Sequence, residues 1–395
     1  MIIFERFIRI TNFIIKIFCG YIFALIIKIF NKNNRNVWII SERGDDARDN
    51  AYFFYKYIRE KHPEIVIYYV ISSKSSDFVR IQNLGKWVEY GSFMHYVYYA
   101  LSKVRISSSI WGGDLPLMSY FKKLRRFRNK KKKFIFLKHG IIKDYLPQHC
   151  YGQAYPNIYV CGAKPEYEYV KENFGYPNGV VQYLGLARFD NLYNLKVKRQ
   201  ILIMPTFRKW LQKMNIEEIK KSEFVYKWNE IINDPRLIYL LENNNLELIF
   251  YPHYVLQKYI SVFTTSTSKI KVAKFCEYDV QTLLKDSLLL VTDFSSVFFD
   301  FAYMNKPVIY YQFDKDEYIN KHYNFTKGYF SYDRDGFGDV VYDNNSLYKS
   351  IKHIIESNFI IDEKYKNRIN NFFPIKDQCN CQRIYEKINL LIGEK

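Results

Sequence analysis

Two histidines follow apolar runs that are typical of buried β-strands. The first run reads Phe134-Ile-Phe-Leu-Lys-His139-Gly140, and the second reads Leu246-Glu-Leu-Ile-Phe-Tyr-Pro-His253. A neutral imidazole at the carboxyl end of a strand can take a proton from an attacking hydroxyl near pH 7. A single histidine is more often structural, but two at strand ends in different domains could converge on one cleft. His139 and His253 are therefore the candidate catalytic residues, with Gly140 as support.

A third motif combines a strand, a short polar turn and an apolar helix. It runs from Leu288 through Val-Thr-Asp-Phe-Ser-Ser to Asp300. A helix start leaves backbone N–H groups free and carries the positive end of the helix dipole, which suits phosphate. Plain N-capping explains the two serines equally well, and the two roles are compatible. The candidate phosphate ligands here are Thr292, Asp293, Ser295, Ser296 and Asp300.

Two arginines follow other strand ends. Thr206 and Arg208 lie in Met-Pro-Thr-Phe-Arg, and Arg188 and Asp190 lie in Gly-Leu-Ala-Arg-Phe-Asp. A guanidinium fork matches phosphate oxygens. We expect Thr206 and Arg208 to contact phosphate and Arg188 and Asp190 to lie near a cleft. Either arginine could instead hold an interdomain ion pair.

Several common signatures are missing from the sequence. Neither the G-x-G-x-x-G fingerprint of dinucleotide sites nor a P-loop is present. Asp333-Arg-Asp335 has the D-x-D spacing of some metal sites but lies in a glycine-rich stretch, so we expect a loop. Cys379 and Cys381 have no further ligands at zinc spacing, and the six cysteines are scattered as in a reduced protein. No metal site is predicted.

Alternation of strands and helices predicts the fold class. The chain has 395 residues, 48% hydrophobic and 25% charged, enough for two domains. Short apolar runs alternate with amphipathic stretches twice along the chain, which indicates two α/β units with mostly parallel sheets. We expect an N-terminal helix over residues 1–30, a first domain over 31–193 and a second over 194–395. A final helix, Cys381–Ile392, could pack back on the first domain.

The N-terminal thirty residues are strongly apolar with a polar stripe. Glu5, Arg9, Asn12 and Lys16 fall on one helical face, and the longest uncharged run, Ile17–Ile27, has eleven residues. A membrane span needs about twenty residues. The pattern therefore favours an amphipathic helix lying in a membrane surface, and the alternative is a helix docked on the protein's own core.

Positive charge is concentrated in one block. The formal net charge is +19, and nine cations occupy twelve positions from Lys122 to Lys133. Such a block is normally a solvated loop, but each cation near an anionic leaflet contributes about 1 kcal/mol. We expect a membrane or polyanion contact through Lys122, Lys123, Arg125, Arg126, Arg128, Lys130, Lys131, Lys132 and Lys133.

In this order the motifs resemble the CDP-glycerol glycerophosphotransferase family, whose members prime and polymerise teichoic acids. The most specific piece is Val-Thr-Asp-Phe-Ser-Ser-Val-Phe-Phe-Asp-Phe-Ala302, followed by Lys-Pro-Val-Ile-Tyr-Tyr-Gln-Phe-Asp314. The family's W-H-G-T-P-L-K, P-T-[WF]-R and R-P-H-P blocks match around His139, Arg208 and His253. Lys138 replaces the Trp, and Tyr251 and Tyr254 replace the Arg and Pro.

The resemblance implies a GT-B architecture, with two Rossmann-like domains facing across a cleft and the nucleotide mostly on the C-terminal one. It implies transfer of glycerol phosphate, or ribitol phosphate, from a CDP-polyol to a hydroxyl of a lipid-linked teichoic-acid-like or capsular polymer. His139 would be the general base. His253, Arg208 and the Ser295-Ser296 turn would hold the pyrophosphate, oriented by Asp293 and Asp300. No cofactor is predicted, although a Mg²⁺ ion bridging the phosphates stays open.

Two other functions fit parts of the sequence. A GT-B glycosyltransferase using a nucleotide sugar would share the fold and the phosphate ligands. A nonenzymatic nucleic-acid or membrane-binding protein would use the basic block, but no RNA-recognition motif is visible, so we expect no nucleic-acid partner. The expected location is the cytoplasmic face of the bacterial membrane, bound peripherally. The sequence leaves open the polyol, the number of units added, wall polymer against capsule, and the oligomeric state.

Overall fold

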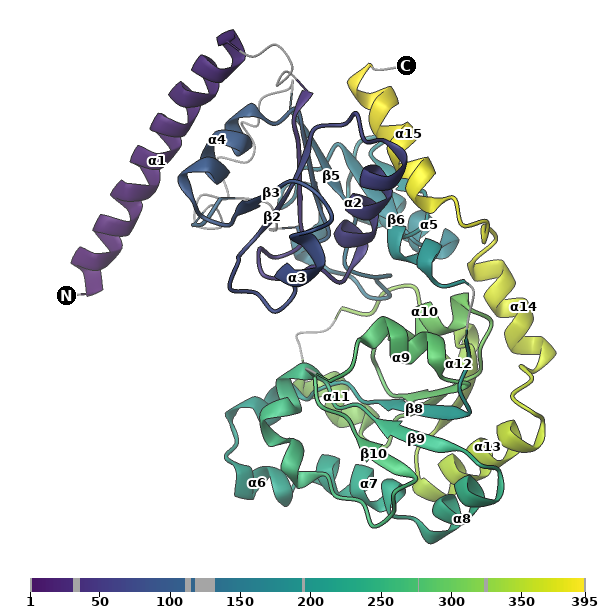
Figure 1. Cartoon of the computed structure of the whole chain (residues 1–395). Coiled ribbons are helices and arrows are strands. Elements are labelled where there is room, and N and C mark those ends of the chain that lie inside the picture. Colours follow the sequence, from purple (N-terminus) through teal and green to yellow (C-terminus); the bar gives the residue numbers. More distant parts are fainter. Residues whose placement is uncertain are drawn as a thin grey trace. The chain divides into compact units, whose positions relative to one another are not determined.

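The computed structural model describes residues 2–30, 36–110, 115–117, 132–193, 196–275, 277–322 and 326–393. The described chain divides into two compact units (Figure 1). The first unit contains Met1–Ile141, Leu146–Asn191 and Asp377–Lys395, and the second contains Ile142–Tyr145 and Leu192–Lys376. The chain therefore enters the second unit briefly at residues 142–145, and its last helix returns to the first.

The first unit is built on a seven-stranded parallel sheet in the order β3-β2-β1-β4-β5-β6-β7. Most of these strands are apolar and buried, as expected where helices cover both faces. The strands are β1 (Trp38–Ser41), β2 (Ile67–Ile71), β3 (Trp87–Glu89), β4 (Val104–Ser107), β5 (Lys133–Phe136), β6 (Ile158–Cys161) and β7 (Val181–Tyr183).

Helices cover both faces of this sheet. Side chains such as Trp38 and Ile40 pack with α2 and α15, whereas Val37 and Ile39 pack with α4, because alternate residues of a strand face opposite sides. The helices are α1 (Ile2–Phe30), α2 (Asn50–Lys61), α3 (Phe78–Ile81), α4 (Phe93–Leu101), α5 (Lys164–Asn173) and α15 (Asn380–Ile392), with 3₁₀ turns η3 (Pro147–His149) and η4 (Ala187–Asn191).

The second unit repeats this plan with a six-stranded parallel sheet in the order β10-β9-β8-β11-β12-β13. A large buried core gathers around Trp228 on one face of the sheet. The strands are β8 (Gln200–Met204), β9 (Glu247–Phe250), β10 (Ile270–Val272), β11 (Leu289–Thr292), β12 (Val308–Tyr311) and β13 (Gly338–Val341).

The helices of the second unit alternate with its strands. They are α6 (Ile216–Lys220), α7 (Glu223–Ile232), α8 (Pro235–Asn243), α9 (Val280–Asp286), α10 (Val297–Tyr303), α11 (Lys315–Lys321), α12 (Tyr332–Asp335), α13 (Asn344–Glu356) and α14 (Glu363–Phe372), with 3₁₀ turns η5 (Lys209–Lys213) and η6 (Tyr254–Val262). The loop expected around Asp333 and Asp335 is wrong, because these residues belong to α12.

In both units the strand order reverses between the first strand and a later neighbour. The reversal lies between β1 and β4 in the first unit and between β8 and β11 in the second. Ligands of open α/β sheets bind outside the carboxyl ends of the strands at such a switch point. The loops after β1, β4, β8 and β11 are therefore the places to look for a site.

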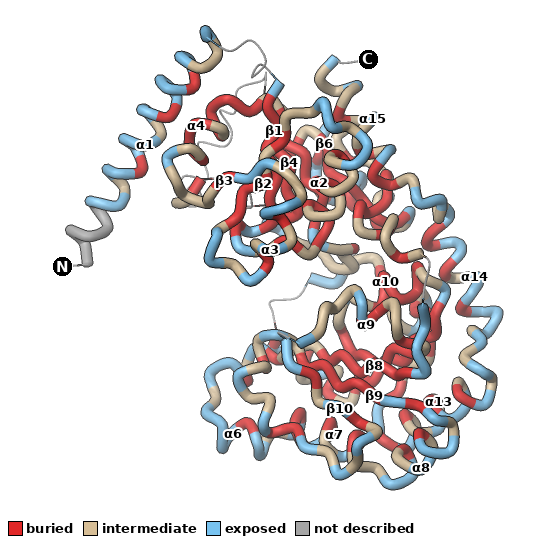
Figure 2. Tube along the Cα trace, viewed as in Figure 1, coloured by how far each residue is buried: buried red, intermediate tan, exposed pale blue. Residues whose placement is uncertain are grey.

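Helix α1 packs along α4 through a narrow buried stripe. Phe13 and Ala24 are buried, and a Cβ atom on Gly20 would lie 2.9 Å from the Cβ of Tyr96. The opposite face is exposed, with Phe18 and Leu25 at 66% and 61% exposure (Figure 2). The helix thus has one docked face and one apolar face in solvent.

Length and hydropathy also fit a membrane span for this helix. The stretch Ile8–Phe30 has a mean hydropathy of 2.3, and 17% of its most apolar window is buried. By length and composition alone, the helix could cross a bilayer. The polar stripe favoured a helix lying in the membrane surface instead. One such helix near an N-terminus is weak evidence of a span.

Candidate functional site

His139 forms the centre of a polar cluster in the first unit. It follows β5, and 70% of its side-chain surface is exposed. Its Nδ1 is ion-paired with Oδ2 of Asp49, and Nη2 of Arg43 lies 3.4 Å from its Nε2. Because a guanidinium only donates, Nε2 is the accepting nitrogen of the neutral ring. This is the tautomer that a general base requires.

The loop between β1 and α2 carries the partners of His139. Asp49 directly precedes α2, and its Oδ1 accepts a 2.6 Å hydrogen bond from Nη1 of Arg188. The same Nη1 donates to the backbone oxygen of His139. Asn50 donates to the backbone oxygen of Lys138 at 2.9 Å and accepts from the Arg188 N–H at 3.0 Å. Asp49, Asn50 and Arg188 therefore hold the histidine loop in place.

The pKa values of the pair follow from this arrangement. The charge of Asp49 raises the pKa of His139. Burial and the charges of Arg43 and Arg188 lower it, but by less, so the pKa is raised overall. Burial would raise the pKa of Asp49, but His139 and Arg188 outweigh it and the pKa is lowered. Asp49 therefore stays ionised, and the imidazole holds its proton to a higher pH than a free histidine does.

Glu42 lies beneath this loop as a buried carboxyl group. It accepts backbone hydrogen bonds from Arg48, Asp49 and Tyr52 at 3.1, 2.7 and 3.2 Å, at the start of α2. Burial, followed by the nearby charge of Asp49, raises the pKa of Glu42 to about 7. Glu42 fixes the turn that presents Asp49.

Lys138 is turned into the protein rather than toward the histidine. Its φ is 63°, a left-handed conformation that is uncommon for a residue with a side chain. The side chain is fully buried, ion-paired with Glu166 and over the ring of Tyr159. This reversal of direction leaves the next residue, His139, facing solvent. The position where the resemblance leads one to expect Trp therefore holds a buried ion pair in this chain.

Asp190 has a structural role in the first unit. It accepts hydrogen bonds from the backbone N–H of Asn380 and Cys381 at 3.0 and 2.8 Å, and from the Asn380 side chain. These groups form the start of α15. Asp190 thus fastens the returning C-terminal helix to the first unit, whereas Gly140 simply follows His139 in the loop after β5.

Arg208 is the centre of a buried charge network in the second unit. Its guanidinium is fully buried and binds both oxygens of Asp314 at 2.6 and 2.9 Å. It also pairs with Asp293 at 2.9 Å and donates to the backbone oxygen of Thr206 at 2.7 Å. Burial opposes the charged form, but the two carboxylates raise the pKa of Arg208 above its usual value.

This network shows what Arg208 contacts in the structure. Two carboxylates flank the guanidinium, and both belong to the same unit as Arg208, so these ion pairs are not interdomain. Arg208 ties the loops after β8, β11 and β12 together. Asp293 extends the tie by accepting the Thr206 N–H at 2.9 Å.

His253 is held by aromatic rings. It precedes η6 and accepts the Val255 N–H at 3.3 Å through Nδ1, which leaves Nε2 as the protonated nitrogen of the neutral ring. The ring of Phe207 packs against those of both His253 and His322, at centroid distances of 4.8 and 4.9 Å. Burial, with the charge of Arg208 next, lowers the pKa of His322 to about 4. His322 is therefore a neutral packing group near pH 7.

The other expected phosphate ligands differ in availability. The Thr292 hydroxyl donates its hydrogen bond to the backbone oxygen of Met204 at 2.6 Å, within the sheet. Asp300 is buried within α10. Ser296 is exposed, Ser295 is half-buried, and Ser296 makes no side-chain cap bond to α10. The two serines are thus the members of the turn that face solvent.

Most of the basic block lies outside the described residues, from Lys122 to Lys131. Lys132 donates to the backbone oxygens of Tyr99 and Ala100 at 3.3 and 2.6 Å, at the end of α4. Burial lowers the pKa of Lys132 to about 7. Lys133 begins β5. Lys132 therefore caps a helix, and Lys133 is part of the sheet.

Within the described ranges, no group of three or more His, Cys, Asp or Glu side chains could hold a metal ion. The side chains that contact His139 are those of Arg43, Asp49 and Arg188.

Two Rossmann-like units with parallel sheets define a GT-B-like fold. A wall teichoic acid polymerase TagF variant has the same fold, with a TM-score of 0.69 at 16% identity, covering 95% of this chain and 98% of that one. A putative UDP-N-acetylglucosamine 2-epimerase from Listeria monocytogenes matches with a TM-score of 0.58 at 14% identity, covering 91% and 98%.

Sequence comparison identifies the family. The model of the CDP-Glycerol:Poly(glycerophosphate) glycerophosphotransferase family matches residues 22–390, so the chain belongs to this family. The minor teichoic acid biosynthesis protein GgaB of Bacillus subtilis is 36% identical over 383 residues, 92% of this chain and 41% of GgaB. A teichoic acid glycerol-phosphate primase of Bacillus subtilis is 26% identical over 193 residues, 46% of this chain and 45% of the primase. The chain spans less than half the length of these relatives.

Sequence reasoning missed the partners that define both clusters. Arg43 and Asp49 lie in Glu-Arg-Gly-Asp-Asp-Ala-Arg-Asp-Asn after β1, a polar run at a strand end that could have been flagged by the same rule as the histidines. Asp314 ends the family motif after β12. His322 carries no signal, since its place depends on the packing of Phe207.

Proposed function

We propose that this chain transfers a polyol phosphate, glycerol phosphate in the first instance, from a CDP-polyol to a hydroxyl of a lipid-linked teichoic-acid-like or capsular polymer. CMP is the second product. Membership of the family supports this kind of reaction. The relatives support it too, since their names refer to teichoic acid biosynthesis and to a glycerol-phosphate primase.

The observation that carries the proposal is the His139–Asp49 pair. Asp49 holds Nδ1–H, and Nε2 accepts. In the reaction, Nε2 takes the proton of the acceptor hydroxyl while its oxygen bonds to the polyol-bearing phosphorus. The bond between that phosphorus and the CMP oxygen breaks, and CMP leaves with the electron pair. The ionised Asp49 stabilises the imidazolium that forms.

The second unit would bind the pyrophosphate of the donor. His253 and the Ser295-Ser296 turn supply donors at the carboxyl ends of β9 and β11. Arg208, Asp293 and Asp314 act as positioning residues, because their mutual pairing fixes the loops that carry Thr206 and the serines. Phosphoryl transfer depends mainly on such positioning and on charge stabilisation.

The proposal includes peripheral attachment to the cytoplasmic face of the membrane. The exposed apolar side of α1 offers Phe18, Leu25, Ile29 and Phe30 to a lipid surface. Sedimentation with vesicles that contain anionic lipid tests this. Replacing Phe18 and Leu25 by Ser should reduce the bound fraction, and binding that is unchanged in this variant would contradict a role for α1.

The donor test uses the purified full chain with lipid-linked acceptor. CDP-glycerol, CDP-ribitol and a panel of nucleotide sugars are supplied separately, and nucleotide release is measured. We expect CMP release from a CDP-polyol that depends on the acceptor. Turnover of a nucleotide sugar without turnover of either CDP-polyol would contradict the proposal and favour a glycosyltransferase.

A further inference from the structure

Arg43 presents an exposed guanidinium beside the candidate base. The residue lies in the loop between β1 and α2, and half of its side-chain surface is exposed. Its Nη2 lies 3.4 Å from Nε2 of His139, the nitrogen that takes the proton of the acceptor hydroxyl in the proposed reaction. Its Nε lies 3.6 Å from Oδ2 of Asp46, a surface contact that involves only one end of the guanidinium. Arg43 therefore combines positive charge, exposure and closeness to the reacting hydroxyl.

Arg188, the second arginine of this cluster, is already engaged within the protein. Its Nη1 donates both to Oδ1 of Asp49 at 2.6 Å and to the backbone oxygen of His139. Only 13% of its side chain is exposed, against 50% for Arg43. Of these two arginines, Arg43 is therefore the one that a substrate reaches more easily.

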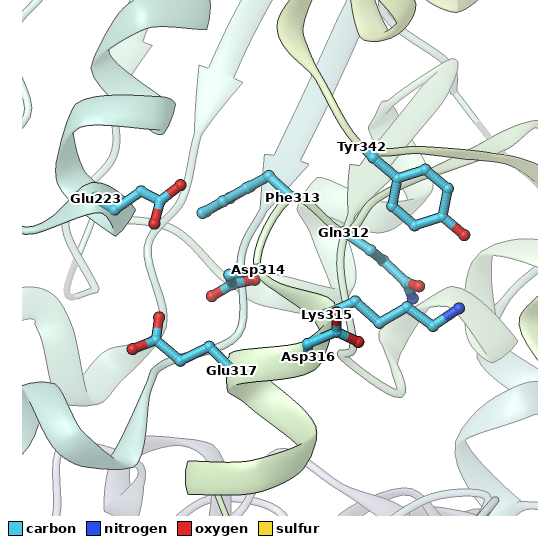
Figure 3. A pocket seen from close by; sticks show the side chains of 8 residues that line it. All are labelled: Glu223, Gln312, Phe313, Asp314, Lys315, Asp316, Glu317 and Tyr342. Atoms are coloured by element: carbon cyan, nitrogen blue, oxygen red, sulfur yellow. The ribbon is translucent and has the colours of Figure 1, made fainter.

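Two cations at strand ends of the second unit have carboxylates around them. Arg208 is fully buried, with Asp293 and Asp314 as its partners. Lys315 shares a polar pocket with several carboxylates, those of Glu223, Asp316 and Glu317 (Figure 3). Such carboxylates compete with a phosphate for the cation. Arg43 differs, because its ion pair with Asp46 is long and exposed.

The reaction brings a phosphoryl group within reach of Arg43. A hydroxyl that gives its proton to Nε2 of His139 lies roughly 2.6–3.2 Å from that nitrogen, and the attacked phosphorus lies roughly 3–3.5 Å from the hydroxyl. The phosphorus is therefore at most about 7 Å from Nε2. Arg43 starts 3.4 Å from the same nitrogen, and its side chain is long and half exposed. A change of rotamer is enough to bring the guanidinium to the phosphoryl oxygens.

Charge gives Arg43 a reason to leave Nε2 during the reaction. When Nε2 takes up the proton, both nitrogens of the imidazolium are donors, and the ring no longer accepts from the guanidinium. The two cations then repel each other. The oxygens of the transferred group carry negative charge, and a guanidinium fork matches them in geometry. Arg43 would therefore exchange Nε2 for phosphoryl oxygens as the proton moves.

We propose that Arg43 is a catalytic residue that donates hydrogen bonds to the non-bridging oxygens of the transferred polyol phosphate. In this step the acceptor oxygen bonds to phosphorus and its proton goes to Nε2 of His139. The bond from phosphorus to the CMP oxygen breaks, and CMP leaves with the electron pair. Arg43 stabilises the charge on the oxygens of the group in transit. This inference rests on the proposed function, because it concerns the same transfer step.

The test compares Arg43→Met with the wild type in acceptor-dependent CMP release from CDP-glycerol. We expect kcat and kcat/KM to fall together by at least about 10²-fold, the usual loss for one transition-state donor. Arg43→Lys keeps the charge without the fork and should lose less. Lys74→Met removes an exposed cation from the loop after β2, at the same edge of the sheet, and should resemble the wild type. Thermal melting checks that each variant folds.

The pH profile separates a phosphate contact from an effect on the base. Asp49 raises the pKa of His139, and the charge of Arg43 lowers it. The acid limb should therefore move to higher pH in Arg43→Met. Above this limb the imidazole is neutral in both proteins, and we expect the loss in kcat to persist there. A loss that disappears above the limb would show that Arg43 only tunes His139 and would overturn the inference.

The outcomes also separate this inference from the proposed function. Wild-type CMP release from CDP-glycerol, with kcat of Arg43→Met within about threefold of it, would overturn the role of Arg43 alone. A raised KM with unchanged kcat would belong to this second case, because Arg43 would then bind the ground state and the transition state equally. Absence of CMP release from either CDP-polyol by the wild type would overturn the proposed function as well.

Discussion

Replacing Asp49 by Asn should disable His139 while leaving its surroundings in place. Arg188 donates to Oδ1 of Asp49 at 2.6 Å, so the oxygen of the Asn side chain would stay on that side. The NH₂ group would then face Nδ1 of His139. A donor facing Nδ1 favours the tautomer with the proton on Nε2, and this tautomer cannot accept the proton of the attacking hydroxyl.

The expected loss in kcat/KM is roughly 10²-fold, about 2.7 kcal/mol of transition-state stabilisation. We place it at the low end for general-base catalysis because 70% of the His139 side chain is exposed, so water can partly replace the lost partner. The pH profile should also move. Asp49 raises the pKa of His139, while Arg43 and Arg188 lower it. Without the carboxylate the pKa falls, so the acid limb of the profile shifts to lower pH.

The assay is CMP release from CDP-glycerol with lipid-linked acceptor, over roughly pH 5 to 9. Asp45→Asn, in the same loop and exposed, is the matched control and should resemble the wild type. The reasoning is refuted if Asp49→Asn keeps kcat/KM within about threefold of the wild type. An unmoved acid limb would refute the electrostatic part separately.

Two further predictions concern stability. Arg208→Leu leaves Asp293 and Asp314 buried without their cation, so the free energy of unfolding should fall by roughly 3–5 kcal/mol in urea titrations; full stability with lost CMP release would instead indicate a direct phosphate contact. Burial raises the pKa of Glu42 from 4.5 to about 7, so the folded state binds this proton more tightly than the unfolded chain. Its contribution to stability is present below 4.5 and is lost as the pH rises through about 7. The free energy of unfolding, measured by urea titration at about pH 5 and about pH 8, should differ less between the two pH values in Glu42→Gln than in the wild type. An equal difference in the two proteins would contradict this.

The architecture was readable from the sequence because buried parallel strands are continuous apolar runs. β1, β5, β9 and β11 each stand out in this way, and their neighbours follow the same alternation. β13 gives a weaker signal, because its four residues, Gly-Asp-Val-Val, are few, partly polar and preceded by a glycine-rich stretch. The D-x-D stretch was read as a loop for the same reason, although it forms the short helix α12.

Side-chain partners were harder to predict than side-chain positions. The strand-end rule places His139 and Arg208 in the correct loops, but it cannot tell which groups will face them. Arg208 meets Asp314, which lies 106 residues further along the chain, and is buried as a result. His139 meets Asp49 because β1 and β5 both adjoin β4. Such pairings depend on strand order and loop conformation, which apolar periodicity does not encode.

The most direct test of the central claim is acceptor-dependent CMP release by His139→Gln. Gln keeps a polar side chain at the end of β5 but cannot take up a proton, and thermal melting reports whether the variant is folded. We predict a loss of at least roughly 10²-fold in kcat/KM with the melting temperature unchanged. Near-normal turnover by the folded variant would contradict the assignment of His139 as the base.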